Sequence, residues 1–301
     1  MKAAAFDYVR AASVEHALEQ LAAHGADAKL LAGGQSLVPM MAMRLLRPAL
    51  LIDIHRLTAL QSIQPQAHAV RTGAGVRQAA LEQALAGDAT LYAQLPLVAQ
   101  ALRWVGHAQT RNRGTVGGSL VHADPSGELP LAALVLNATL HLHQQGEPGS
   151  PAQRSLDAGS FLTGPMSCAA TETECLTAID WPVWQGPGIG SAFDEVAIRH
   201  GDFALASAAA QLQVDPQGIC RRASFGAGGV AGVPLVFPHL ADQQHHAHAG
   251  CHRAPHQPWP AAAQQRQSGR SAGLHPFRIF RLGRGGQAQR HHTGLTGAGA
   301  L

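Results

Sequence analysis

Hydrophobic residues near the start of the chain recur with the period of an amphipathic helix. Four apolar residues lie three or four positions apart and so share one helix face: Val14, Ala17, Leu18 and Leu21. Ser13 stands before them as a suitable N-cap, and Gly25 follows them as a typical stop signal. The pattern therefore predicts a helix from residue 14 to about residue 24.

The rest of the chain divides into two parts by the same criteria. Up to about residue 175, helices and strands are mixed: strands are expected at 29–32, 50–54, 69–73 and 138–143, and helices at 36–46, 76–85, 95–105 and 128–136. Further on, strands are expected at 176–181, 192–198, 208–214 and 222–226. Residues 146–154, rich in Pro and Gly, predict a loop.

Composition places the chain among packed globular proteins. Hydrophobic residues make up 46% of it and charged residues 14%, which is enough apolar material for a core. No apolar run reaches the roughly 18 residues of a membrane span. The first eight residues are too short and too polar for a signal peptide. We therefore expect a cytoplasmic protein without a membrane span.

The net charge of +3 averages two unlike segments. Residues 1–238 contain 15 Lys and Arg against 18 Asp and Glu, a net charge of −3. Residues 239–301 contain 7 Arg, no Lys and a single acid, Asp242, a net charge of +6. The basic character lies in the last segment, so it does not indicate nucleic-acid binding by the folded part.

Residues 239–301 also differ from the rest of the chain in composition and in the pattern of hydrophobic residues. They hold 9 of the 18 His, and neither a helical nor a strand period persists in them. Such a segment cannot bury enough apolar surface to offset its ordering entropy. We interpret it as a frameshifted or misassembled reading of the gene that begins between Leu235 and Gln244, with a genuine disordered tail as the alternative.

Several kinds of site are disfavoured by the residues present. The four cysteines, Cys168, Cys175, Cys220 and Cys251, form no C-x-x-C pair, which argues against zinc or iron–sulfur ligation and for free thiols. His122 and Asp124 have no third ligand at a suitable spacing, so no metal site is expected. The G-x-G-x-x-G fingerprint, the P-loop and the G-x-S-x-G elbow are all absent.

Two glycine-rich runs remain as the main chemical signal. They are Ala32-Gly33-Gly34-Gln35-Ser36 and Thr115-Val116-Gly117-Gly118-Ser119. Glycines let a backbone approach a ligand closely, and consecutive bare N–H groups form an anion-binding concavity. Two such turns predict a ligand with two phosphates, held differently from a Rossmann fold. Glu128 follows the second run at a helix start, where it is either a helix-dipole partner or an acceptor for a ligand hydroxyl.

Five sequence blocks follow one another in a recognisable order: 6–8 with 13–15, 30–39 with Arg44, 111–119, 123–130 and 199–204. Together they resemble one family, the medium, FAD-binding subunit of molybdenum hydroxylases. That family includes carbon monoxide dehydrogenase medium chains and the flavin domain of xanthine dehydrogenase, and the resemblance covers residues 1 to 238.

The resemblance implies an α+β fold. A two-lobed FAD-binding domain of the vanillyl-alcohol-oxidase (PCMH) type is expected at 1–175, the start of a smaller and here incomplete C-terminal domain at 176–238, and the atypical tail at 239–301. The FAD contacts carried over are Lys29, Leu30, Leu31, Ala32, Gly33, Gly34, Gln35, Ser36, Thr115, Val116, Gly117, Gly118 and Ser119, with Glu128 near the adenosine ribose. No catalytic residue is implied in this chain.

The resemblance also implies a role in electron transfer. A small partner subunit with 2Fe-2S clusters passes electrons to the FAD, which hands them to an external acceptor, while a large partner subunit oxidises the substrate at a molybdenum cofactor. The assembly is expected to be a heterotrimer or its dimer, a heterohexamer. The alternative is a stand-alone flavin-dependent oxidase or reductase of the same fold. The substrate is chosen in another subunit, so this sequence leaves it open.

Overall fold

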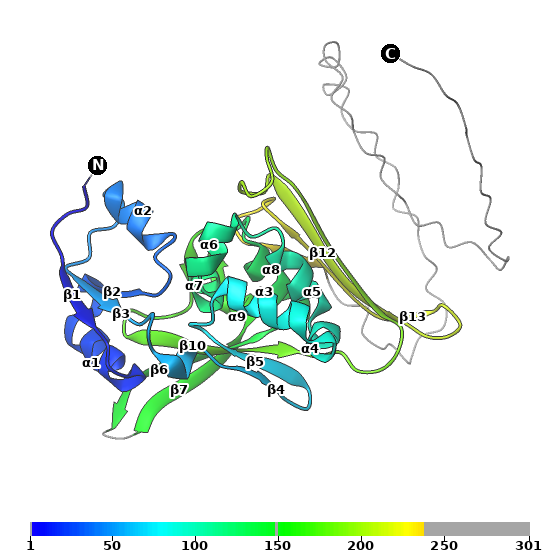
Figure 1. The fold of residues 1–301 in the computed structure, drawn as a ribbon, viewed down its shortest axis with the longest axis horizontal. Helices are drawn as coiled ribbons and strands as arrows, with labels where there is room; N and C mark the ends of the chain where they lie inside the picture. Colours follow the sequence, from blue (N-terminus) through cyan, green and yellow to red (C-terminus); the bar gives the residue numbers. More distant parts are fainter. Residues whose placement is uncertain (1, 148–149, 238–301) are drawn as a thin grey trace, which may run out of the picture. The chain divides into compact units, whose positions relative to one another are not determined.

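The computed structural model of the chain describes residues 2–147 and 150–237 (Figure 1). The interpretation of residues 239–301 as a frameshifted or disordered tail therefore concerns residues outside the described part. The described part contains sheets of three, five, four and two strands, together with a layer of helices.

The first sheet has three parallel strands, in the order β1 (Asp7–Arg10), β3 (Leu50–Asp53) and β2 (Ala28–Leu31). Helix α1 (Val14–His24) covers it and confirms the predicted helix. The Ser13 hydroxyl accepts a hydrogen bond from the His16 N–H, and three of the four predicted apolar residues, Ala17, Leu18 and Leu21, are buried. Shorter pieces nearby are η1 (Gly25–Asp27), α2 (Leu37–Ala42) and η2 (Thr58–Leu60).

The second sheet has five antiparallel strands. Their order is β4 (Ile63–Pro65), β5 (Ala69–Gly73), β10 (Glu174–Pro182), β6 (Thr139–Glu147) and β7 (Ser150–Asp157). β7 corrects the predicted loop at 146–154. Among the described strands its partner is β6 alone, and such an edge strand tolerates the proline that argued against a strand.

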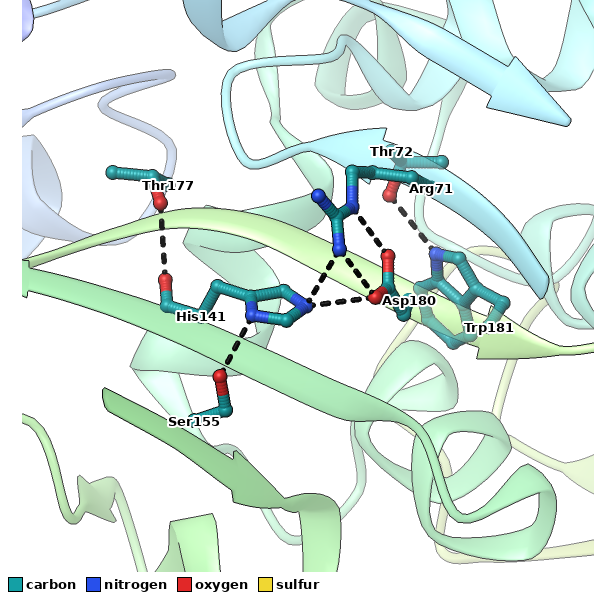
Figure 2. Close-up of polar contacts among 7 residues, drawn as sticks. All are labelled: Arg71, Thr72, His141, Ser155, Thr177, Asp180 and Trp181. Carbon is teal, nitrogen blue, oxygen red and sulfur yellow. Dashed lines mark hydrogen bonds and ion pairs between the residues drawn. The ribbon is translucent and has the colours of Figure 1, made fainter. Parts of the chain in front are cut away.

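A group of helices and one face of the second sheet enclose the main hydrophobic core. The helices are α3 (Gln78–Gly87), α4 (Ala89–Gln94), α5 (Pro96–Leu102), α7 (Val116–His122), α8 (Glu128–Leu136) and α9 (Ala158–Phe161). Helix α6 (Ala108–Arg113) packs against α3 and has no buried residue. Trp181 is fully buried in this core, and its indole N–H donates to the hydroxyl of Thr72 over 2.9 Å (Figure 2). Beside the core, β8 (Leu162–Gly164) pairs with β9 (Ser167–Cys168).

The opposite face of the second sheet carries a polar network instead (Figure 2). Arg71 donates two hydrogen bonds of 2.6 Å to Asp180, and the His141 ring lies 2.8 Å from the same carboxylate and 2.8 Å from the Ser155 hydroxyl. Burial alone would raise the pKa of Asp180, but the hydrogen bonds from Arg71 and His141 outweigh it and lower that pKa. The network ties neighbouring strands together.

The third sheet contains β11 (Ile189–Val196), β12 (Ala206–Val214), β13 (Cys220–Gly228) and β14 (Leu235–Phe237), all antiparallel. Helix α8 lies close against it. The Ser224 hydroxyl donates to the Val135 carbonyl over 2.6 Å, and a Cβ on Gly226 would meet Leu131 and Val135 at 2.7 Å. The strand-rich second part of the chain is thus found as predicted.

Candidate functional site

The first glycine-rich run leaves strand β2 and packs directly against the residues that lead into the second run. A Cβ on Gly33 would lie 2.4 Å from the Arg113 carbonyl oxygen and 2.8 Å from the Gly114 Cα atom. Both neighbours are backbone, so no flexible side chain could move aside. Gly34 adopts a φ of 70°, the left-handed conformation that favours glycine. The two runs, far apart in the sequence, therefore meet at one place.

The first run offers unused hydrogen-bond donors at this place. Among the described residues, the N–H groups of Gly33, Gly34, Gln35 and Ser36 have no backbone or side-chain acceptor. The side-chain amide of Gln35 donates a hydrogen bond of 3.2 Å to the Gly33 carbonyl within the same run. Consecutive free N–H groups around a left-handed glycine form an anion-binding concavity. The predicted bare N–H groups are therefore found in this run.

The second run differs from the expected open turn, because it forms the first turn of α7. Its N–H groups are already bonded: Val116 to the Val76 carbonyl at 2.9 Å, Gly117 to the Ala74 carbonyl at 2.9 Å, and Gly118 to the Thr115 hydroxyl at 3.0 Å. Thr115 acts as the N-cap of the helix. The prediction of bare N–H groups is therefore wrong for this run.

The glycines of the second run are explained by packing. A Cβ on Gly117 would lie 2.4 Å from the Cβ of Ala74, in a third loop, 73–75, that connects β5 to α3. In the sequence, this loop is notable only because Gly73-Ala74-Gly75 matches the start of the G-x-G-x-x-G motif without its third glycine. Ser119 is also engaged, since the Gln78 amide donates to its hydroxyl over 3.0 Å. Gln78 is buried, and its Oε1 atom has no partner among the described residues.

Two arginines, Arg77 and Arg113, lie beside the runs. Arg77 donates to the Arg113 carbonyl, and neither guanidinium forms an ion pair among the described residues. Burial and the nearby Arg113 lower the pKa of Arg77, against the opposing effect of Asp53. Arg111, by contrast, pairs with Glu82 at 2.9 Å. Free cations next to free N–H groups suit an anionic ligand, and sequence reasoning missed the role of Arg77.

Asp53 is the last residue of β3 and pairs with Leu31, the residue of β2 from which the first run continues. It is almost fully buried. Burial alone would raise its pKa, but hydrogen bonds from the Tyr8 hydroxyl and from His55 prevail and lower it. Asp53 therefore stays ionised and fixes the strand end.

The remaining predicted contacts are Lys29 to Leu31, which precede the first run in the sequence, and Glu128, which follows the second. Lys29, Leu30 and Leu31 belong to β2 and pair with β3, so their backbone supports the first run. Glu128 begins α8, beyond the seven residues of α7, which is about 10 Å long at about 1.5 Å per residue. Burial raises the pKa of Glu128 to about 7, and Glu195 and Asp124 add to this.

The block 199–203 lies against the connection between α5 and α6. The His200 ring contacts the Trp104 ring edge-on at 5.6 Å between centroids, and a Cβ on Gly201 would meet the His107 ring at 2.4 Å. A pocket opens here, lined by Tyr92, Gln100, Arg103, Trp104, Phe193 and His200. This connection runs on into the second glycine-rich run through α6.

Residues 2–147 and 150–237 contain neither a metal-binding cluster nor a membrane-spanning helix. No group of three or more His, Cys, Asp or Glu side chains in this range could hold a metal ion. Every helix in the same range is too short or too polar to cross a bilayer.

Comparison with known proteins gives consistent matches. Residues 4–184 match the model of the FAD binding domain in molybdopterin dehydrogenase. Subunit alpha of the 6-hydroxypseudooxynicotine dehydrogenase complex of Paenarthrobacter nicotinovorans is 42% identical over 225 residues, which are 74% of this chain and 72% of the relative. The carbon monoxide dehydrogenase medium chain of Hydrogenophaga pseudoflava is 34% identical over 208 residues, 69% of each chain.

Solved structures agree with the sequence matches. Reconstituted CO dehydrogenase from Oligotropha carboxidovorans superposes with a TM-score of 0.72 and 34% identity, over 78% of this chain and 79% of that one. Quinoline 2-oxidoreductase from Pseudomonas putida 86 gives a TM-score of 0.70 and 34% identity, over 78% of both chains. The expected α+β fold class and the expected family resemblance are confirmed.

Proposed function

The chain belongs to the family of FAD-binding domains in molybdopterin dehydrogenases, and we propose that it is the electron-transfer subunit of a multi-subunit molybdenum hydroxylase. The relatives are dehydrogenase subunits, so the chain is part of an oxidoreductase, and it carries an FAD-binding domain. In the proposed route, electrons arrive from the 2Fe-2S clusters of a small partner subunit. They leave through the FAD to an external acceptor.

The observation that carries the proposal is the meeting of the two glycine-rich runs. Free N–H groups of Gly33 to Ser36 lie beside a closely approaching backbone at Arg113 and Gly114, near the guanidinium groups of Arg77 and Arg113, which form no ion pair with any described residue. Backbone donors plus cations are the chemistry that recognises a diphosphate. A diphosphate is the centre of FAD, so the residues present fit this cofactor. When bound, FAD supplies the redox chemistry, while the protein positions it and tunes its electronics.

Within this proposal the residues have distinct roles. Ala32 to Ser36 hold the diphosphate through backbone N–H groups, and Lys29 to Leu31 support that run from β2. Thr115 to Ser119 form the rigid opposite wall, where the glycines permit close packing. Glu128 accepts a hydrogen bond from an FAD hydroxyl. Residues 1–175 form the FAD-binding domain and 176–238 begin a second domain.

The partners in the proposal are a large molybdopterin-binding subunit and a small 2Fe-2S subunit. The relatives named as a complex subunit alpha and a medium chain support a multi-subunit assembly. The described cysteines, Cys168, Cys175 and Cys220, do not cluster, so the proposal assigns the iron–sulfur centres to a partner. A heterotrimer or its dimer follows from this division of cofactors.

Co-purification tests the proposal. The chain is expressed with its native neighbouring gene products, and the visible spectrum and the iron and molybdenum content of the purified material are measured. Flavin, iron and molybdenum in one complex are expected. A yellow single chain that turns over a substrate alone would establish the alternative, a stand-alone flavin oxidase or reductase.

A further inference from the structure

Glu195 is a buried carboxylic acid with no partner in the described part of the chain. It lies on β11, is 8% exposed, and both of its carboxyl oxygens are buried without a hydrogen bond. It shares the helix-facing side of the third sheet with Phe193, two residues earlier, which packs into the main core. Glu195 therefore points into the molecule rather than to solvent.

A second unpartnered polar group lies directly opposite. Ser207 on β12 is the register partner of Glu195, is 4% exposed, and has a buried hydroxyl with no hydrogen bond among the described residues. The hydroxyl is closely confined, since a Cβ on Gly228 would lie 2.5 Å from it. Two adjacent strands thus place a carboxyl and a hydroxyl side by side without satisfying either one.

The loop before α8 brings a third polar group to this place. The Gly229 N–H donates to the Pro125 carbonyl over 2.8 Å, which docks the loop on the end of β13 beside Ser207. Three residues after Pro125 comes Glu128, the first residue of α8. The charge of Glu195 acts on Glu128, so the two carboxyls lie near each other. Neither forms an ion pair among the described residues.

Buried polar groups are nearly always hydrogen-bonded, and a buried acid without a partner is costly. Glu195 and Ser207 are two such groups, and Glu128 adds a third carboxyl near them. Together they indicate a ligand that supplies hydrogen-bond donors. Along the chain, Glu128 follows the second glycine-rich run after α7, a helix about 10 Å long, and the loop 123–127. FAD carries hydroxyl groups on both sides of its diphosphate, on the ribose and on the ribityl chain, and hydroxyls are suitable donors to a carboxylate.

We propose that Glu195, together with Ser207 and Glu128, forms a subsite that binds sugar or ribityl hydroxyl groups of FAD. This inference rests on the proposed function, because it needs FAD to be the ligand of the glycine-rich runs. The electrostatics agree with it: burial raises the pKa of Glu195 to about 7, as it does for Glu128. The carboxyls of Glu195 and Glu128 can therefore take up protons and become neutral while no ligand is bound.

The test compares FAD affinity in two variants and one control. Glu195→Gln removes the charge at constant size, and Ser207→Ala removes the hydroxyl. Glu172→Gln is the matched control, since Glu172 is an exposed glutamate that undergoes the same change of side chain. FAD is titrated into flavin-free protein and binding is followed by flavin fluorescence. We expect Glu195→Gln to weaken FAD binding about tenfold to a hundredfold and the control to have no effect.

Thermal unfolding of the flavin-free variants separates binding from structure. If Glu195 serves the ligand, Glu195→Gln replaces a buried acid that has no partner in the described part of the chain, and it leaves the flavin-free protein as stable or more stable. Competition with ADP and with FMN locates the hydroxyl: weaker ADP binding in the variant assigns the ribose, and weaker FMN binding assigns the ribityl chain.

Unchanged FAD affinity in both Glu195→Gln and Ser207→Ala, with a wild type that binds FAD, would overturn this inference alone. The inference also fails if the flavin-free variants unfold at a lower temperature in proportion to their lost affinity. A wild type that binds no FAD would overturn the proposed function with it.

Discussion

Replacing Gly33 by alanine tests whether close approach of the two glycine-rich runs builds the cofactor site. The added Cβ would lie 2.4 Å from the Arg113 carbonyl oxygen, whereas ordinary contact begins at 3.4 Å. The runs must therefore separate by about 1 Å, and overpacking of this kind costs about 1–3 kcal/mol of stability. The same displacement draws the N–H groups of the first run away from the diphosphate.

The loss of one hydrogen bond to a charged group is worth about 1.5–3 kcal/mol, which weakens FAD binding roughly tenfold to 150-fold. Fluorescence titration of flavin-free protein measures the affinity, and thermal unfolding measures the stability. Gly87→Ala is the control, because nothing lies within 4 Å of its added Cβ and alanine favours the helix in which Gly87 stands. Wild-type affinity in Gly33→Ala would refute the reasoning.

Three other changes have distinct expected outcomes. Arg77→Gln should weaken FAD binding and make it less sensitive to salt, measured by titration at several ionic strengths, because the proposed diphosphate site loses one cation. Trp181→Phe should lower the free energy of unfolding by about 1–3 kcal/mol, because it leaves the buried Thr72 hydroxyl without its hydrogen-bond donor. Adding Thr72→Val should recover part of this lost stability. Asp180→Asn should destabilise the protein by about 1–3 kcal/mol at pH 7 in urea unfolding. Because the folded-state pKa of Asp180 is lowered, its contribution is present above the ordinary value of 3.8 and the gap to wild type should close as the pH falls below it.

Local signals explain what the sequence could predict. Helix α1 is set by its own spacing, its Ser13 cap and its terminal glycine, all within a short stretch of chain. The strands of the third sheet follow from short apolar runs between turns. The first glycine-rich run was also predictable, because the left-handed conformation of Gly34 and the free N–H groups are local properties.

Long-range packing explains what the sequence could not predict. Two N–H groups of the second run, those of Val116 and Gly117, are bonded to Val76 and Ala74, about forty positions away, and no local pattern reveals such partners. Arg77 and Glu195 gain their significance from neighbours on other elements. The predicted helix at 36–46 ended early, at Ala42, because Arg44 takes a left-handed conformation with a φ of 60°.

Hydrogen–deuterium exchange over residues 32–38, compared between flavin-free and FAD-loaded protein, tests the central claim most directly. The free N–H groups of Gly33 to Ser36 should exchange rapidly without FAD and become strongly protected with it. The N–H groups of Val116 to Gly118, already bonded within the protein, should change much less. Stoichiometric FAD binding without any protection at Gly33 to Ser36 would contradict the account.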